Sequence, residues 1–125
     1  MVIKADIRSF RDLEIWRKGI ELVKSIYEIS KSFPRTEVYG LASQVRRAAV
    51  SVPSNIAEGH IRAHKKEFKQ FLFRTLGSLA ELETQITIAS ELNYMDLNHY
   101  EKTIKEIDIL GKQIRALILK LTPKP

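Results

Sequence analysis

The fold of this chain is decided by residues 45–59, Val-Arg-Arg-Ala-Ala-Val-Ser-Val-Pro-Ser-Asn-Ile-Ala-Glu-Gly. Apolar side chains recur in and just before this stretch at spacings of three and four residues, at Leu41, Val45, Ala49, Val52 and Ile56. At 100° per residue, these positions fall on one face of a helix. The sequence therefore predicts a helix from Tyr39 or Gly40 to about Gly59, with its apolar face turned toward a core.

The other face of this expected helix carries few charges. Between residues 41 and 59 only Arg46, Arg47 and Glu58 are charged, whereas 29% of the whole chain is charged. A helix face turned to water normally carries Lys and Glu. We therefore expect this helix to be buried on more than one side.

Pro53 lies inside the same pattern, because the apolar face continues from Val52 to Ile56 across it. A proline there cannot donate to the carbonyl of the residue four positions earlier, at a cost of about 3 kcal/mol. We expect the helix to continue through Pro53 with a kink. A polar cluster surrounds the kink, and its hydroxyl and amide groups can bind freed backbone groups or a neighbouring helix. The cluster consists of Ser51, Ser54, Asn55 and Glu58.

The remaining sequence predicts three more helices, over residues of about 10–33, 64–92 and 97–121, and no strand. Ser9 or Asp12 can cap the first, and Pro34 ends it. His64 stands where Ser would complete a capping box with Glu67, so the cap of the third helix is incomplete. Close helix packing explains the glycines inside helices, at positions 19, 77 and 111.

Short loops between long consecutive helices place those helices antiparallel. The predicted fold is therefore all-α, an up-down-up-down antiparallel four-helix bundle with its second helix kinked at Pro53. Residues 1–125 form one domain, in which residues 1–9 are an N-terminal arm and residues 122–125 are a short C-terminal tail.

Some helices have more apolar positions than one bundle core uses. The first helix has two apolar seams, one through Leu13, Trp16, Ile20, Val23 and Tyr27 and one through Ile15, Leu22, Ile26, Ile29 and Phe33. Phe73 forms a second seam on the third helix with Leu76 and Ala80, although its ring could instead stack on a base. Surplus apolar surface favours self-association. The expected interface residues are Ile15, Leu22, Ile29 and Phe73.

Composition argues against several classes of function. The chain has no cysteine, no signal-peptide-like apolar run and no stretch long enough to span a membrane, so we expect a cytoplasmic protein. Its five glycines occur singly, which removes the usual phosphate-binding loops. Its three histidines have no carboxylate at metal-ligand spacing. We expect no enzyme activity, no cofactor and no metal site.

The chain is basic, with 21 Lys and Arg against 15 Asp and Glu, a formal net charge of +6 and a pI of about 9.7. Such a charge favours anionic partners, nucleic acid first, although it also serves solubility alone. Lys65 and Lys66 lie in the first turn of the third helix, where the helix dipole disfavours cations, and this hints at an external anion. The candidate nucleic-acid contacts are Arg62, Lys65, Lys66, Lys69 and Arg74, with Arg46, Arg47, Arg17 and Lys18 as weaker contributors.

Residues 43–59 closely resemble the signature of the four helix bundle protein family, also called the 23S rRNA intervening sequence protein family. The resemblance extends to Phe10-Arg11-Asp12-Leu13, Trp16, Phe33-Pro34, Tyr39-Gly40-Leu41, Lys66-Glu67-Phe68 and residues 77–85, and so covers nearly the whole chain. The accessory variability protein of diversity-generating retroelements looks like a relative. That relative assists a reverse transcriptase and binds nucleic acid as a homopentamer. The resemblance therefore implies a pentamer with RNA or DNA as a partner, and it suggests a reverse transcriptase or ribosomal RNA as a further one.

Two hypotheses about function follow. The first is a non-enzymatic, homo-oligomeric accessory protein that binds nucleic acid through a basic face with little sequence specificity. The second is a protein–protein adaptor or structural oligomer whose basic face is merely solvated. Salt-dependent binding of RNA separates them, because only phosphate contacts release counterions.

Overall fold

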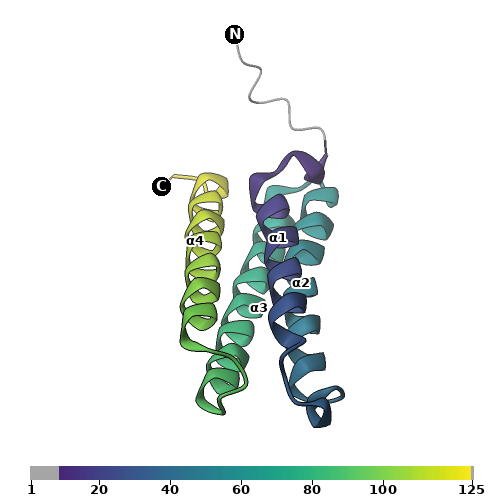
Figure 1. The fold of residues 1–125 in the computed structure, drawn as a ribbon. Helices are drawn as coiled ribbons and strands as arrows, with labels where there is room; N and C mark the ends of the chain where they lie inside the picture. Colours follow the sequence, from purple (N-terminus) through teal and green to yellow (C-terminus); the bar gives the residue numbers. More distant parts are fainter. Residues whose placement is uncertain (1–8, 125) are drawn as a thin grey trace.

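The computed structural model describes residues 9–124 and shows four long helices packed side by side (Figure 1). The elements are a 3-10 helix η1 (Phe10–Asp12), α1 (Glu14–Ser30), a 3-10 helix η2 (Arg35–Glu37), α2 (Leu41–Ile61), α3 (Lys65–Glu91) and α4 (Leu97–Leu121). None of the residues from 9 to 124 is in a strand. The helices alternate in direction, so the predicted all-α antiparallel bundle is confirmed. Most of the expected N-terminal arm falls in residues 1–8, which lie outside the described part.

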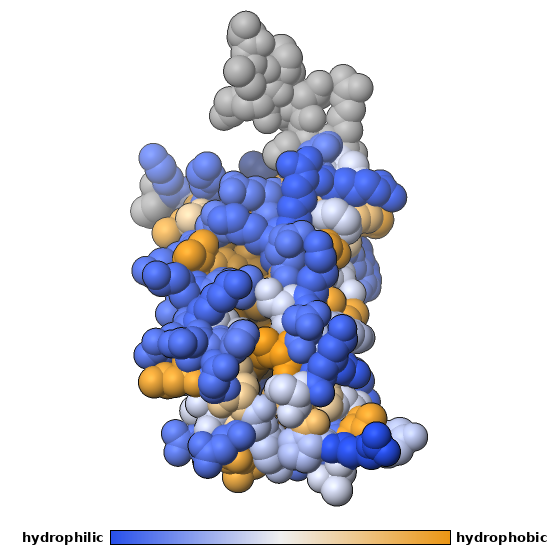
Figure 2. All heavy atoms as spheres, viewed as in Figure 1, coloured by the Kyte–Doolittle hydropathy of each residue, from blue (hydrophilic) through white to orange (hydrophobic). Residues whose placement is uncertain are grey.

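The antiparallel order places three segments at one end of the bundle. The start of α1, the turn between α2 and α3, and the end of α4 lie together there, and the α3–α4 turn lies at the opposite end (Figure 1). Figure 2 shows this face with apolar side chains near its middle and hydrophilic side chains on both sides of them. No helix within residues 9–124 is long and apolar enough to cross a bilayer.

α2 is the most enclosed helix, as its low charge predicted. It packs against both α1 and α3. Val45, Ala49, Val52 and Ile56 are completely buried, which confirms the predicted core face. Ala42 and Ala48, outside that stripe, are also buried. The small side chains of α2 therefore let two helices pack close to it.

Pro53 lies inside α2, which continues to Ile61, so the prediction of a helix through the proline is confirmed. The Pro53 ring is buried against α1. A Cβ placed on Gly19 would lie 3.2 Å from the Cβ of Pro53, tighter than almost all real contacts. Gly19 therefore allows the close approach of α1 to the proline, as predicted for this glycine. The bend at Pro53 stays a prediction.

The second glycine that matters is Gly59, which the sequence assigned to the end of α2. That assignment was wrong by two residues, since α2 continues to Ile61 and the left-handed residue after it is Ala63, with φ of 65°. A Cβ on Gly59 would lie only 2.5 Å from the Cβ of Phe71 on α3. Gly59 is thus needed for the contact between α2 and α3, not for a turn.

By contrast, the predicted packing role of Gly77 is wrong, because nothing lies within 4 Å of a Cβ built there.

α1 is rotated so that the seam expected at an oligomer interface faces the core instead. Ile15 and Leu22 are 6% and 1% exposed, so their assignment to a surface between subunits is wrong. Ile29 is half-buried against the same core. The other seam of α1 is the more exposed one, with Tyr27 43% exposed. Both seams are apolar at helical spacing, and only the positions of α2 and α4 decide which one turns inward.

The helix ends differ from the expected ones by a few residues. Ser9 caps η1 by accepting from the Arg11 N–H at 3.1 Å, and α1 itself begins at Glu14 and ends at Ser30. The His64 side chain makes no capping bond, so the predicted incomplete cap of α3 is confirmed.

Where α1 packs against α4, Ser25 donates a hydrogen bond of 3.2 Å to the carboxylate of Glu106. Desolvation by burial raises the pKa of Glu106 above its usual value, and the Ser25 bond only partly opposes this.

We predict that Gly59→Ala lowers the free energy of unfolding by about 1–3 kcal/mol, because the added methyl group forces α2 and α3 apart. The matched control is Gly77→Ala on the exposed surface of α3. That change raises the free energy of unfolding by about 0.5–1 kcal/mol, because alanine costs less backbone entropy and meets no neighbour. Urea unfolding followed by circular dichroism measures both. Equal effects of the two changes would contradict the packing role of Gly59.

Candidate nucleic-acid interface

The bundle separates charge along its length. The basic half, defined as residues 9–20, 52–77 and 110–124, contains the start of α1, the α2–α3 turn and the end of α4. It holds twelve Lys and Arg but only four Asp and Glu, a formal charge of +8. The acidic half, residues 21–51 and 78–109, holds seven Lys and Arg against ten Asp and Glu, a formal charge of −3. The positive potential of the molecule is therefore concentrated at one end.

Lys65 and Lys66 form the exposed first turn of α3 within the basic half. In residues 9–124, no carboxylate forms an ion pair with either lysine within 4.0 Å. Lys69, one turn further along α3, lies beside the end of α4 and donates a hydrogen bond of 3.4 Å to the hydroxyl of Thr122. These three lysines of the candidate set therefore lie together on the first two turns of α3.

The two arginines of the predicted set lie elsewhere. Arg62 follows α2 and is not part of α3, and its guanidinium contacts Glu58 at 3.1 Å and Glu67 at 3.7 Å. Arg74 lies on the side of α3 that carries Phe71, with its guanidinium 4.5 Å from the centre of that ring. Arg62 thus precedes the helix that carries the lysines, although its ion pair with Glu67 keeps it beside the first turn of α3. The cations spread around the basic end.

The structure does not bring Arg46 and Arg47 to this end. They lie in the acidic half, about 24 Å along α2 from Arg62 at 1.5 Å per residue. Arg46 donates a hydrogen bond of 2.8 Å to Ser30 and stacks on the ring of Tyr27, so it joins α2 to α1. Arg47 is exposed beside the groove between α2 and α3.

Arg17 and Lys18 do lie in the basic half, but they have partners there. The Arg17 Nε donates to the Arg11 carbonyl at 3.1 Å, and Lys18 pairs with Glu14 at 3.7 Å.

The sequence reasoning missed the cations of α4. From Ile109 to Lys124 the chain has no Asp or Glu, and the antiparallel fold places this segment beside the start of α3. The signal was visible as an acid-free run, but only the topology shows that it adjoins Lys65 and Lys66. The segment adds Lys112, Arg115, Lys120 and Lys124 to the basic half.

The polar cluster around Pro53 makes contacts within α2 and between α2 and α3. The hydroxyls of Ser51 and Ser78 lie 2.7 Å apart and join α2 to α3, while Asn55 donates to the Ser51 carbonyl at 2.8 Å. Ser54 is exposed, and Glu58 pairs with Arg62. Ser51 and Asn55 thus bind a neighbouring helix and the backbone, whereas the carbonyl that Asn55 binds is that of Ser51 and not the one of Ala49 that Pro53 leaves without a donor.

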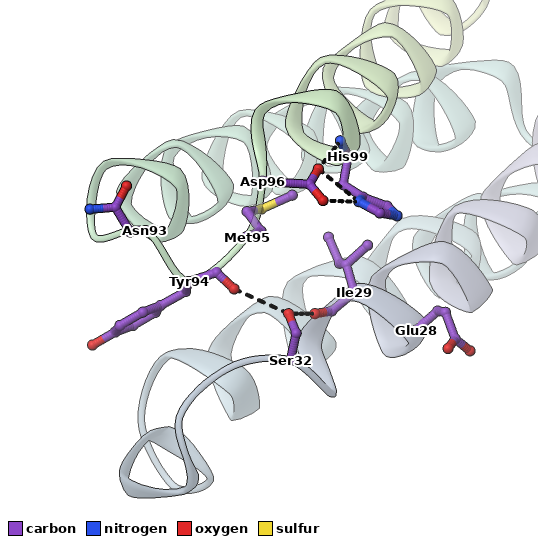
Figure 3. A pocket seen from close by; sticks show the side chains of 8 residues that line it. All are labelled: Glu28, Ile29, Ser32, Asn93, Tyr94, Met95, Asp96 and His99. Carbon is purple, nitrogen blue, oxygen red and sulfur yellow. Dashed lines mark hydrogen bonds and ion pairs between the residues drawn. The ribbon is translucent and has the colours of Figure 1, made fainter.

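A hollow of about 490 Å³ lies at the other end of the bundle, between the end of α1 and the α3–α4 turn (Figure 3). The polar groups that line this hollow make hydrogen bonds to or within the α3–α4 turn. Asp96 accepts from the backbone N–H of His99 at 2.8 Å and contacts its ring nitrogen, and these bonds lower the pKa of Asp96. The Ser32 hydroxyl faces two backbone carbonyls. Within residues 9–124, no three His, Asp or Glu side chains could hold a metal ion together.

Comparison with known proteins identifies the family. The family model of the 23S rRNA-intervening sequence protein matches residues 11–116. A protein with unknown function from the S23 ribosomal protein family of Bacteroides thetaiotaomicron has a similar structure, with a TM-score of 0.77. The two chains are 19% identical over 83% of this chain and 97% of the other, so the likeness shows the fold alone. No curated protein matches the chain. Since the family model covers most of its length, the chain belongs to the 23S rRNA-intervening sequence protein family.

Proposed function

We propose that this protein is a non-enzymatic accessory protein of the cytoplasm that assembles with itself and binds RNA or DNA through its basic half. The observation that supports this most is the separation of charge, with +8 on one half and −3 on the other. Charged side chains that serve solubility alone do not have to be concentrated at one end of the molecule. Collected charge attracts a polyanion and orients it toward that end.

The chemistry of the basic half favours phosphate over bases. Lys65 and Lys66 are exposed point charges, and such lysines contact phosphates without reading sequence. They also lie against the dipole of α3, which costs about 0.3–1 kcal/mol each and is offset when an anion binds. Binding through these groups has little sequence preference. A reverse transcriptase or ribosomal RNA is the further partner that the family resemblance suggests.

Self-assembly adds to this function. In a ring of five copies, the number that the resemblance suggests, five times +6 gives a formal charge of +30 on one particle. Repeated basic halves raise the effective concentration of weak phosphate contacts. Of the interface residues expected from the sequence, Phe73 is the one whose side chain is available, at 58% exposed. On the same side of α3, Ala80 and Ile88 are also exposed.

We predict that replacing Lys65 and Lys66 by alanine reduces the dependence of nucleic-acid affinity on salt. Each lost phosphate contact lowers the slope of log affinity against log salt by about 0.9 on a duplex and about 0.7 on a single strand, per engaged subunit. The matched control replaces Lys102 and Lys105, two exposed lysines of the acidic half, and changes the net charge equally. Fluorescence anisotropy with structured RNA and random DNA, between about 50 and 200 mM salt, measures the slopes.

The control distinguishes binding at a local interface from a general effect of the protein's net charge. If both pairs of substitutions reduce the slope equally, the basic half is not the interface. If the wild type does not bind either nucleic acid at low salt, the adaptor hypothesis replaces the nucleic-acid one.

We also predict that Phe73→Asp dissociates the assembly, because it places a charge in an apolar contact between subunits. Light scattering of the variant should give a mass near 14.4 kDa, with the helix content unchanged. Val38→Asp, at a 50% exposed apolar residue near η2, is the control and should leave the mass of the wild type. A wild type that is itself a monomer at micromolar concentration refutes the assembly.

A further inference from the structure

Phe71 is buried in an unusual way. Its side chain is only 5% exposed, although two charged side chains lie over its ring. Gly59 of α2 lies against its Cβ. The guanidiniums of Arg62 and Arg74 cover its ring, with their central carbons 5.2 Å and 4.5 Å from the ring centre. Gly59 of α2 and the two arginines are therefore part of what encloses the ring.

This arrangement places both guanidiniums beside the same ring. Because both central carbons lie near the same ring centre, they cannot be more than about 9.7 Å apart, the sum of the two distances. Stacking on an aromatic face restrains a guanidinium while its N–H groups stay available at its edge. Those groups match the oxygens of a phosphate.

The charged groups around the two arginines differ. Arg62 contacts the carboxylates of Glu58 and Glu67, both of them on or near the α2–α3 turn. In residues 9–124, Arg74 forms no ion pair within 4.0 Å. A carboxylate presents the same paired oxygens to a guanidinium as a phosphate does. Glu58 contacts Nη2 of Arg62 and Glu67 contacts Nη1, and both nitrogens are donors of the kind that bind phosphate oxygens.

We propose that Phe71 is a positioning residue that holds Arg62 and Arg74 as a clamp for neighbouring phosphates of one nucleic-acid strand. In the free protein, Glu58 and Glu67 occupy the Arg62 side of the clamp, and a phosphate replaces them on binding. This inference rests on the proposed function, and it adds to that function the residues that receive the strand and the group that positions them.

The first test separates positioning from charge. Phe71→Leu keeps an apolar side chain beside Gly59 but removes the ring, so the arginines remain charged and lose their support. We expect the affinity for fluorescent single-stranded DNA of random sequence to fall about tenfold, from the cost of ordering two long side chains on binding. The salt slope should stay unchanged, because the number of neutralised phosphates is the same. Replacing Arg62 and Arg74 by alanine should instead reduce the slope by about 1.4, at about 0.7 per contact.

The second test does not disturb the packing. Glu58→Gln frees Arg62 from its nearest carboxylate at an exposed position. Its charge-matched control is Glu91→Gln, at the exposed end of α3 in the acidic half. We expect Glu58→Gln to tighten binding about twofold to fivefold beyond the control, the scale of an exposed ion pair. Circular dichroism confirms that each variant is folded before its affinity is compared.

The outcomes distinguish the clamp from the function on which it rests. If the wild type binds with a steep salt dependence but Glu58→Gln matches Glu91→Gln, the clamp is wrong and the proposed function stands. The same conclusion follows if folded Phe71→Leu binds like the wild type, or loses slope as the double arginine variant does. If the wild type does not bind at low salt, both the proposed function and the clamp are refuted.

Discussion

The whole structure depends on how closely other helices approach α2. Pro53 costs about 3 kcal/mol inside a helix, and the fold retains it at the contact with Gly19, where α1 has no side chain to keep it away. Gly59 lies six residues further along α2. Because it has no side chain to clash with Phe71, it lets α3 approach α2 closely as well. Burial of the apolar face of α2 on both sides offsets the cost of the proline. A side chain at Gly59 would force α3 away from α2, and one at Gly19 would crowd the Pro53 ring.

This packing also determines the geometry of the basic half. Because α2 lies so close to α3 at Gly59, the chain that leaves α2 carries Arg62 over the ring of Phe71. The antiparallel topology then adds the end of α4, through the contact between Lys69 and Thr122. Lys120, in the last turn of α4, is favoured there by the helix dipole, whereas Lys65 and Lys66 at the start of α3 are not. Folding alone explains the position of Lys120, whereas the position of Lys65 and Lys66 is one of the grounds for the proposed interface.

The sequence predicted those features that periodicity controls. The four helices, the buried face of α2 and the helix through Pro53 all follow from spacings of three and four residues. The rotation of α1 could not be predicted, because its two apolar seams are equivalent until the neighbouring helices are placed. Gly59 was misjudged for a similar reason, since a glycine near a helix end suits both a turn and a close contact.

The candidate site was predictable only in part. The lysines of α3 are close in sequence and appear together in the structure. The ion pairs of Arg62, the stacking of two arginines on Phe71 and the acid-free end of α4 depend on contacts between helices. Such contacts leave no periodic signal in a single sequence.

The most direct test of the account is to locate bound nucleic acid on the wild-type protein. Backbone amide shifts in nuclear magnetic resonance spectra would be compared with and without single-stranded DNA. The account predicts that the largest changes fall within residues 58–74 and 110–124, and that the α3–α4 turn is unaffected. Changes that are largest within residues 78–109, or that are spread evenly over both halves, would contradict it.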